Sequence, residues 1–220
     1  MTVMDKIKPW TLILLIVLAL CLRHTPADAG ETRTLTVAGG CFWCVEADFE
    51  KVKGVTGAVS GYSGGSLANP TYKQVTRGGT GHYEAVQITF DPAVIDRATL
   101  LHLFLRSVDP TDAGGQFCDR GDSYRTAIFV SGPDQQALAQ QAIARAQAEL
   151  GQKIVTPILP SAPFYRAEDY HQDFYKGRSY MLTRYGPRSQ KKAYKLYRDS
   201  CGRDARVRQL WGDAAAFAGS

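Results

Sequence analysis

Two cysteines spaced as Cys-x-x-Cys, Cys41 and Cys44, are the residues best suited to chemistry in this chain. Cys41 follows Gly39-Gly40 and precedes an apolar run with helical spacing, so we expect it to open a helix. Unpaired backbone N–H groups at a helix N-terminus carry partial positive charge and favour a thiolate. We therefore expect a nucleophilic Cys41 with a pKa below the free value of about 8.5. The two glycines are expected to let a substrate approach the backbone.

The Cys-x-x-Cys spacing has two chemical interpretations. It suits reversible thiol–disulfide exchange, with Cys44 as the partner of Cys41. It also forms half of a zinc site, but no second Cys-x-x-Cys and no His-x-x-x-His follows in the sequence. Redox chemistry without a metal is therefore the favoured interpretation.

Glu84 is a candidate proton donor. It lies in the predicted strand 82–90, where the period of two places it on one face with Val86, Ile88 and Phe90. Burial of a carboxylate beside apolar side chains raises its pKa, which would keep the acid neutral near pH 7. The alternative is a solvated glutamate at the end of the strand.

Four further residues are candidates for contact with a polar substrate, and two of them, Tyr72 and Tyr124, flank long loops. Tyr72 and Tyr124 could donate hydrogen bonds to a substrate oxygen, although ordinary aromatic packing would also explain them. Asp119 could line the site, or its side chain could only stabilise the turn in which it lies. His171 is crowded by aromatic residues, which is typical of a structural hydrogen-bond partner.

Phe42 and Trp43 stand directly beside the predicted nucleophile. Phe42 has the spacing of a core residue of the helix. Two large aromatic side chains next to a reactive thiol also form an apolar rim for a substrate.

The elements that must position these residues follow the order strand, helix, strand, strand, helix, strand. We expect strands over 32–38, 55–62, 82–90 and 124–130, and helices over 42–52, 96–107 and 133–150. This order predicts an α+β fold, a ferredoxin-like β-α-β-β-α-β sandwich with two helices on one face of the sheet. The loops from Gly64 and from Asp109 are long enough to carry function. A short fifth strand is expected over 154–159.

Composition sets the protein class. The chain of 220 residues is 45% hydrophobic with a net charge of +5, and it has five cysteines. It is too apolar for a disordered chain and too poor in cysteine for a disulfide scaffold. No block of Lys and Arg is present, so nucleic acid is not an expected partner.

The N-terminal residues 1–29 resemble a secretory signal peptide. Lys6 and Lys8 precede the apolar run 11–22, and Ala27-Asp28-Ala29 has the small-x-small pattern of a cleavage site. We expect an exported, periplasmic or extracellular enzyme with no stable membrane insertion after cleavage. The alternatives are an uncleaved anchor through 11–22 and a lipid anchor on Cys21. Residues 30–186 are the expected catalytic domain, and 187–220 are the expected basic, irregular C-terminal tail, in which a short helix is expected near 206–211.

Six ordered segments resemble the A-type peptide methionine sulfoxide reductases. The segments cover most of residues 35–185, so the resemblance does not depend on one short motif. They are GGCFWCVEADFE from Gly39, GVTGAVSGYSGG from Gly54, NPTYKQV from Asn69, TGHYEAVQITFDP from Thr80, DPTDAGGQFCDRGDSYRTAIF from Asp109 and APFYRAEDYHQDFY from Ala162.

The resemblance implies reduction of the S epimer of methionine sulfoxide, free or in proteins. Cys41 would attack the sulfoxide sulfur while Glu84 protonates the departing oxygen. Tyr72 and Tyr124 would hydrogen-bond that oxygen. The remaining substrate-binding residues would be Phe42 and Trp43, which hold the methyl group, with Asp119 and His171.

After this step a second cysteine would condense with the sulfenic acid of Cys41. We favour Cys44, because one helical turn brings its sulfur near Cys41; Cys201 is the alternative and Cys118 the third choice. The resemblance implies a thioredoxin-like protein as electron donor and no bound cofactor or metal. We expect a monomer.

Two other functions fit parts of the sequence. A general thiol–disulfide oxidoreductase would use the Cys-x-x-Cys segment but would not need Glu84 on an apolar strand face. A zinc or structural-disulfide binding module would need neither a nucleophile nor an acid.

Overall fold

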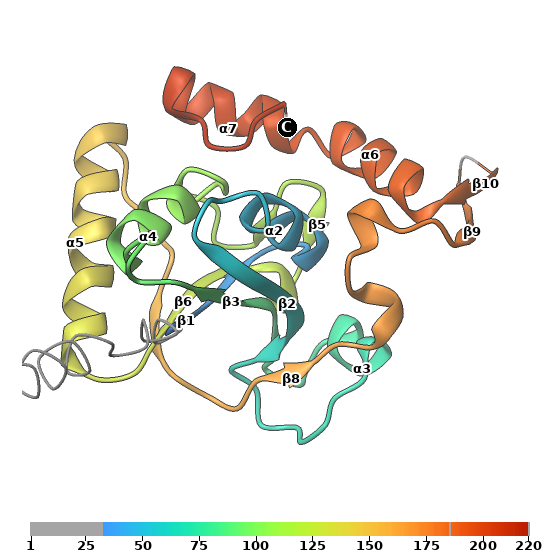
Figure 1. Ribbon diagram of the computed structural model, residues 1–220, viewed down its shortest axis with the longest axis horizontal. Coiled ribbons are helices and arrows are strands. Elements are labelled where there is room, and N and C mark those ends of the chain that lie inside the picture. Colours follow the sequence, from blue (N-terminus) through green and yellow to red (C-terminus); the bar gives the residue numbers. More distant parts are fainter. Residues whose placement is uncertain (1–32, 185, 220) are drawn as a thin grey trace, which may run out of the picture. The chain divides into compact units, whose positions relative to one another are not determined.

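The computed structural model describes residues 33–184 and 186–219 (Figure 1). The predicted signal peptide, its cleavage site and Cys21 lie outside the described residues. The α+β class predicted from the sequence is confirmed, since helices pack on a central sheet that is largely antiparallel. No helix within the described ranges is both long and apolar enough to span a membrane.

The central sheet has six strands in the order β7-β6-β1-β3-β2-β8. Among the described strands of this sheet, only the β6–β7 pair is parallel. The strands are β1 (Arg33–Gly39), β2 (Val55–Ser63), β3 (Tyr83–Phe90), β6 (Thr126–Val130), β7 (Ile158–Pro160) and β8 (Tyr165–Arg166). The fifth predicted strand is therefore shorter and later than expected, and β8 was not foreseen.

Three helices, α2 (Phe42–Phe49), α4 (Arg97–Leu105) and α5 (Pro133–Leu150), pack on one face of the sheet. Alternate strand residues such as Val37, Val86 and Ile128 meet them in one apolar core. The ends of the helices follow local sequence rules: Asp96 caps α4 by accepting the backbone N–H of Thr99 at 2.7 Å. The core thus fixes α2 against the end of β3.

The loops that we expected between the elements contain additional short structure. The loop from Gly64 holds helix α3 (Tyr72–Arg77), which a Thr71–Gln74 capping box starts. The loop from Asp109 holds a small hairpin. Further short elements in the described ranges are β4 (Gly115–Gln116), β5 (Asp119–Arg120) and the 3₁₀ turns η2 (Asp122–Tyr124), η3 (Asp169–His171), η4 (Phe174–Lys176) and η5 (Gly212–Ala214).

The prediction of an irregular C-terminal tail was wrong, except for the short helix expected near 206–211. A hairpin of β9 (Tyr180–Thr183) and β10 (Gly186–Ser189) leads into helices α6 (Gln190–Ser200) and α7 (Arg203–Trp211). These helices lie above α2 in the view of Figure 1. The sequence analysis missed the amphipathic pattern of this basic segment. The pattern can be interpreted only once α2 is known to pack against it.

Buried charge ties the C-terminal helices to the rest of the fold. Arg198 of α6 forms a salt bridge of 2.8 Å with Asp48 of α2, and both side chains are buried. Arg203 of α7 donates to the carbonyl oxygen of Gly39 at 3.2 Å and is also buried. The C-terminal helices are therefore part of the folded domain and not a separate tail.

This arrangement predicts that Arg198→Ala lowers the free energy of unfolding by about 3–5 kcal/mol, because it leaves the Asp48 carboxylate buried without its partner. Urea denaturation followed by circular dichroism measures the loss. Arg145→Ala is the control, since Arg145 pairs with Glu149 on the exposed face of α5 and should cost at most about 1 kcal/mol. Equal losses in both variants would contradict the role of the buried pair.

Candidate active site

A cavity of about 50 Å³ brings the predicted site residues together. Apart from Tyr197, each residue that lines it was predicted from the sequence. The lining residues are Cys41, Phe42, Trp43, Tyr72, Glu84, Asp119, Tyr124 and Tyr197.

Cys41 lies at the N-cap of α2, as its sequence position predicts, and only 6% of it is exposed. The low pKa that we expected for Cys41 is not found. Burial raises the pKa of the Cys41 thiol, and the hydrogen bond that it donates to Cys44 raises it further. The nearby helix N–H of Phe42 does not serve the sulfur, because it donates to Glu84 instead.

Cys44 lies one turn further along α2 and is 1% exposed. Its sulfur accepts the hydrogen bond from Cys41, which lowers the pKa of the Cys44 thiol. The guanidinium groups of Arg203 and Arg198 lower it further. The free thiols of Cys41 and Cys44 therefore share one buried environment, in which Cys44 is the more acidic.

Glu84 faces the same cavity from the end of β3. Its side chain is 2% exposed and lies on the core face with Val86 and Ile88. The backbone N–H of Phe42 donates to its Oε2 at 3.1 Å. Burial outweighs this hydrogen bond and raises the pKa of Glu84 to about 8. The group is consequently a neutral acid at pH 7.

Two phenols stand beside Glu84. Tyr72 begins α3, where its backbone N–H donates to Glu168 at 2.9 Å, and Tyr124 ends η2. The hydroxyl of Tyr124 hydrogen-bonds that of Tyr72. Burial raises the pKa of both phenols, so both remain protonated and able to donate hydrogen bonds.

Tyr197, which the sequence analysis did not single out, comes from α6. Its hydroxyl donates to the carboxylate of Asp119 at the wall of the cavity. Burial raises the pKa of Asp119, while this hydrogen bond opposes the rise. The sequence signal was the helical spacing of Ala193, Tyr194 and Tyr197, which pack against the cysteines.

His171 does not line the cavity, contrary to its assignment as a substrate-binding residue. Its Nδ1 accepts the indole N–H of Trp43 at 3.1 Å, and its ring packs on Phe42 and Tyr72. Burial lowers the pKa of His171 to about 4, so the ring is neutral. Trp43 also stacks on Phe174, with ring centroids 3.7 Å apart. His171 therefore acts on the site by orienting Trp43.

The glycine pair before Cys41 has a packing role rather than the predicted one. Gly40 has a φ of +76°, and a Cβ there would lie 2.5 Å from Cβ of Gln116. A Cβ on Gly39 would meet Val45 and Val108. The space that we expected for substrate is thus filled by the protein itself.

The other two cysteines of the described chain form a disulfide, Cys118–Cys201. It lies at the wall of a second, larger cavity of about 380 Å³. Trp43, Asp119 and Tyr197 line both this cavity and the one that contains Cys41. A pairing of Cys118 with Cys201 was not among the sequence-based expectations.

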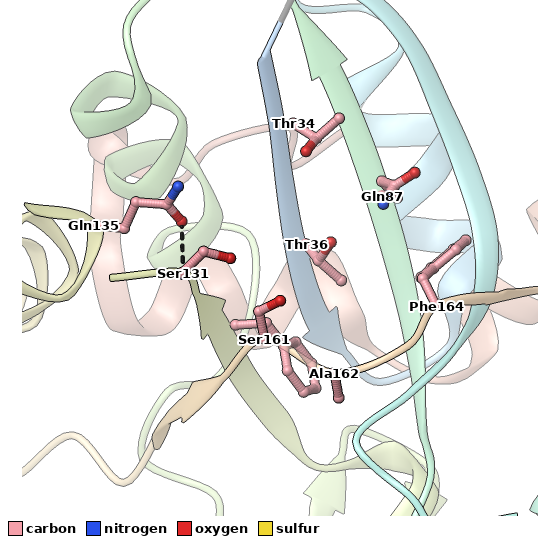
Figure 2. Close-up of a pocket in the computed structure, with 9 residues that line it drawn as sticks. Thr34, Thr36, Gln87, Ser131, Gln135, Ser161, Ala162 and Phe164 are labelled. Atoms are coloured by element: carbon pink, nitrogen blue, oxygen red, sulfur yellow. Dashed lines mark hydrogen bonds between the residues drawn. The ribbon is translucent and has the colours of Figure 1, made fainter. Parts of the chain in front are cut away.

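Two other features of the described residues lack the groups for catalysis. The cavity of about 110 Å³ in Figure 2 lies on the opposite face of the sheet and has no ionisable side chain in its lining. Its polar groups bond locally, as where the Ser131 N–H donates to Gln135. A second feature is a cluster of three carboxyl groups that lie close enough together to hold a cation, those of Glu46, Glu50 and Asp173. Neither Cys41 nor Cys44 is part of this cluster.

Comparison with known proteins agrees with this arrangement. Residues 33–201 match the family model of peptide methionine sulfoxide reductase. The chain is 47% identical over 205 residues to peptide methionine sulfoxide reductase MsrA 2 of Caulobacter vibrioides, covering 91% of this chain and 98% of that protein. It is 46% identical over 198 residues to the MsrA 2 protein of Rhizobium meliloti, covering 90% and 93%.

Solved structures give the same result. The crystal structure of reduced Mxr1 from Saccharomyces cerevisiae is similar, with a TM-score of 0.64 at 30% identity over 68% of this chain and 87% of that one. Methionine sulfoxide reductase A of Corynebacterium diphtheriae has a TM-score of 0.60 at 30% identity, covering 68% and 76%. The chain therefore belongs to the peptide methionine sulfoxide reductase family, and the protein is an enzyme of this type.

Proposed function

We propose that this enzyme reduces the S epimer of methionine sulfoxide, free and in proteins, through Cys41 and Glu84. One observation carries the proposal: a buried neutral acid and a buried thiol line the same small cavity. A sulfoxide oxygen is a poor leaving group until it is protonated, so reduction by a thiol needs an acid in this position.

In the first step Cys41 attacks the sulfoxide sulfur, and Glu84 gives its proton to the oxygen. The hydroxyl then passes from the substrate sulfur to the Cys41 sulfur, so that the S–O bond and the new bond between the two sulfurs both break. Methionine leaves, its sulfur reduced by two electrons, and Cys41 becomes a sulfenic acid. The proton that Cys41 loses restores Glu84. The raised pKa of Cys41 is compatible with this order, because the protonated sulfoxide carries positive charge that favours the thiolate in its immediate neighbourhood.

The remaining lining residues orient the substrate. Tyr72 and Tyr124 have phenolic donors in the cavity and would hold the oxygen beside Glu84. Phe42 and Trp43 present an apolar wall that suits the methyl group. Asp119, which accepts the hydrogen bond from Tyr197, would supply further polar contacts.

We favour Cys44 as the resolving cysteine. Its sulfur already hydrogen-bonds Cys41, and its lowered pKa supplies the thiolate needed for attack on the sulfenic acid. The attack forms the Cys41–Cys44 disulfide and releases water. Cys201 remains the alternative, since it lines the neighbouring cavity.

The rest of the proposal concerns the setting of the enzyme. A thioredoxin-like protein would reduce the disulfide with no bound cofactor, and the enzyme would repair oxidised proteins as a monomer outside the cytoplasm. Export rests on the pattern of residues 1–29 alone. An oxidising compartment would make a dedicated donor necessary.

We expect Cys41→Ser to abolish reduction of methionine S-sulfoxide, since a hydroxyl cannot replace the thiol as nucleophile or reductant. Methionine formation with excess dithiothreitol measures the activity. An unchanged circular dichroism spectrum shows that the variant is folded. Retained turnover in a folded variant would exclude the proposed mechanism.

We expect the single-turnover rate to fall as pH rises through about 8, because the raised pKa of Glu84 keeps the acid protonated only below that value. Glu84→Gln should lower the rate by about 10²- to 10⁴-fold and remove this alkaline limb. Asp134→Asn on the exposed face of α5 is the control. A Glu84→Gln variant that kept both the rate and the limb would contradict the assignment.

We expect Cys44→Ser to form about one methionine per chain and then to stop under thioredoxin-driven conditions, because Cys41 remains a sulfenic acid without its partner. Quenched-flow counting of methionine and a steady-state assay with thioredoxin measure the two parts. Normal thioredoxin-driven turnover in this variant would show that a cysteine other than Cys44 is the resolving cysteine.

A further inference from the structure

We propose that the cavity of about 380 Å³ beside the catalytic cavity is a second substrate subsite. It takes a large apolar side chain that lies next to the methionine sulfoxide in a polypeptide, and its surroundings favour acidic residues beyond that side chain. The inference rests on the proposed function and deepens it, because it names the oxidised segments that the enzyme reduces fastest.

The catalytic cavity has room only for the end of the substrate side chain. Its volume is about 50 Å³, and a single water molecule already takes about 30 Å³ in the liquid. The sulfoxide group and its methyl therefore fill this cavity, and the rest of a polypeptide substrate must lie outside it. The residues beside the catalytic cavity consequently decide which sequences bind well.

The larger cavity adjoins the catalytic cavity. Trp43, Asp119 and Tyr197 line both of them. The ring of Trp43 is fixed between the two cavities, since it stacks on Phe174 with ring centroids 3.7 Å apart. A chain whose methionine sulfoxide reaches Cys41 therefore brings a neighbouring side chain within reach of the larger cavity.

Apolar side chains make up much of the lining of the larger cavity. Phe174 and Ala193 are buried there, whereas Met181 and Leu182 of β9 are 37% and 82% exposed. Together with Tyr180 they form a run of three exposed, large apolar side chains in β9. An apolar side chain of the substrate would cover Met181 and Leu182 and remove apolar surface from water, which favours binding.

The walls of the larger cavity are held in place without a substrate. The backbone N–H of Gln190 donates to the carbonyl oxygen of Ser179 at 2.9 Å, which closes the base of the β9–β10 hairpin. The Cys118–Cys201 disulfide is part of the lining and ties the end of α6 to the loop that contains Cys118. A binding surface that is already formed loses little conformational entropy when a ligand binds.

The segment that forms this side of the enzyme is positively charged. Six of the eighteen residues from 178 to 195 are Lys or Arg, and none is Asp or Glu. Arg184 of this segment lines the cavity itself. Asp119 is the one acidic residue of the lining, and its carboxylate accepts the hydrogen bond from Tyr197. An acidic polypeptide is therefore attracted to this side of the enzyme, and a basic one is repelled.

Symmetric peptides test the subsite without any assumption about the direction of the bound chain. Each is a blocked pentapeptide with methionine S-sulfoxide in the centre, Leu or Ser on both sides of it, and Asp or Lys at both ends. The first turnover is measured with the enzyme in excess and without added reductant, so that the Cys118–Cys201 disulfide stays intact.

We expect the Leu peptides to react with a second-order rate constant about 10- to 100-fold larger than that of the Ser peptides, because a leucine side chain is buried. The gain should lie in the half-saturating enzyme concentration and not in the maximum rate. With Leu in place, Asp ends should react about 3- to 10-fold faster than Lys ends at about 0.05 M salt, and this ratio should approach one at about 1 M salt.

A double variant of the hairpin locates the preference. Met181→Ser/Leu182→Ser removes the apolar side chains of β9, so the Leu and Ser peptides should react with nearly the same rate constant. Val94→Ser is the matched control, since Val94 is another exposed apolar residue, 50% exposed, and does not line the cavity. This variant should keep the full preference for Leu. Circular dichroism checks that both variants are folded.

The possible outcomes are separable. Equal rate constants for the Leu and Ser peptides with the wild-type chain would overturn the subsite, and so would an unchanged preference in the folded double variant. Equal rates for Asp and Lys ends at low salt would overturn the preference for acidic segments. The absence of methionine from the free amino acid and from all peptides would overturn the proposed function instead. The wild-type comparison holds even if the double variant fails to fold.

Discussion

The hydrogen bond from the backbone N–H of Phe42 to Glu84 holds the active site together. It joins the first turn of α2 to the end of β3 and places the acid beside the residue that precedes Phe42, the nucleophile Cys41. The carboxyl needs burial to stay protonated, and the apolar rows of β3 and α2 supply that burial. The apolar packing that stabilises the sheet thus also raises the pKa of Glu84, the buried acid at the cavity.

The hydrogen bond also has a consequence for Cys41. A helix N-terminus can stabilise a nearby anion, but each N–H group serves few partners. Burial raises the pKa of the Cys41 thiol, and because Glu84 takes the Phe42 N–H, the sulfur also lacks that donor; Cys41 is therefore a thiol. We infer that the acid and the substrate together provide the charge that converts it to a nucleophile.

Positive charge for the second cysteine comes from the C-terminal helices. Arg198 and Arg203 are buried against α2 and act on Cys44, while Tyr197 of the same segment fixes Asp119 at the cavity. A buried guanidinium is costly unless it has a partner, and Asp48 and the Gly39 carbonyl are those partners. The C-terminal helices are therefore part of the catalytic arrangement as well as of the fold.

The local features of the site could be predicted from the amino-acid sequence. Glycines, caps and periodicity located Cys41 at a helix start and Glu84 on an apolar strand face, because these depend on neighbours in the chain. Three other features could not be predicted from it. They are the pKa order of Cys41 and Cys44, the Cys118–Cys201 bond, and the positions of Tyr197, Arg198 and Arg203. Each of these depends on burial and on groups far away in the sequence, and a basic, polar segment does not reveal which surface it will cover.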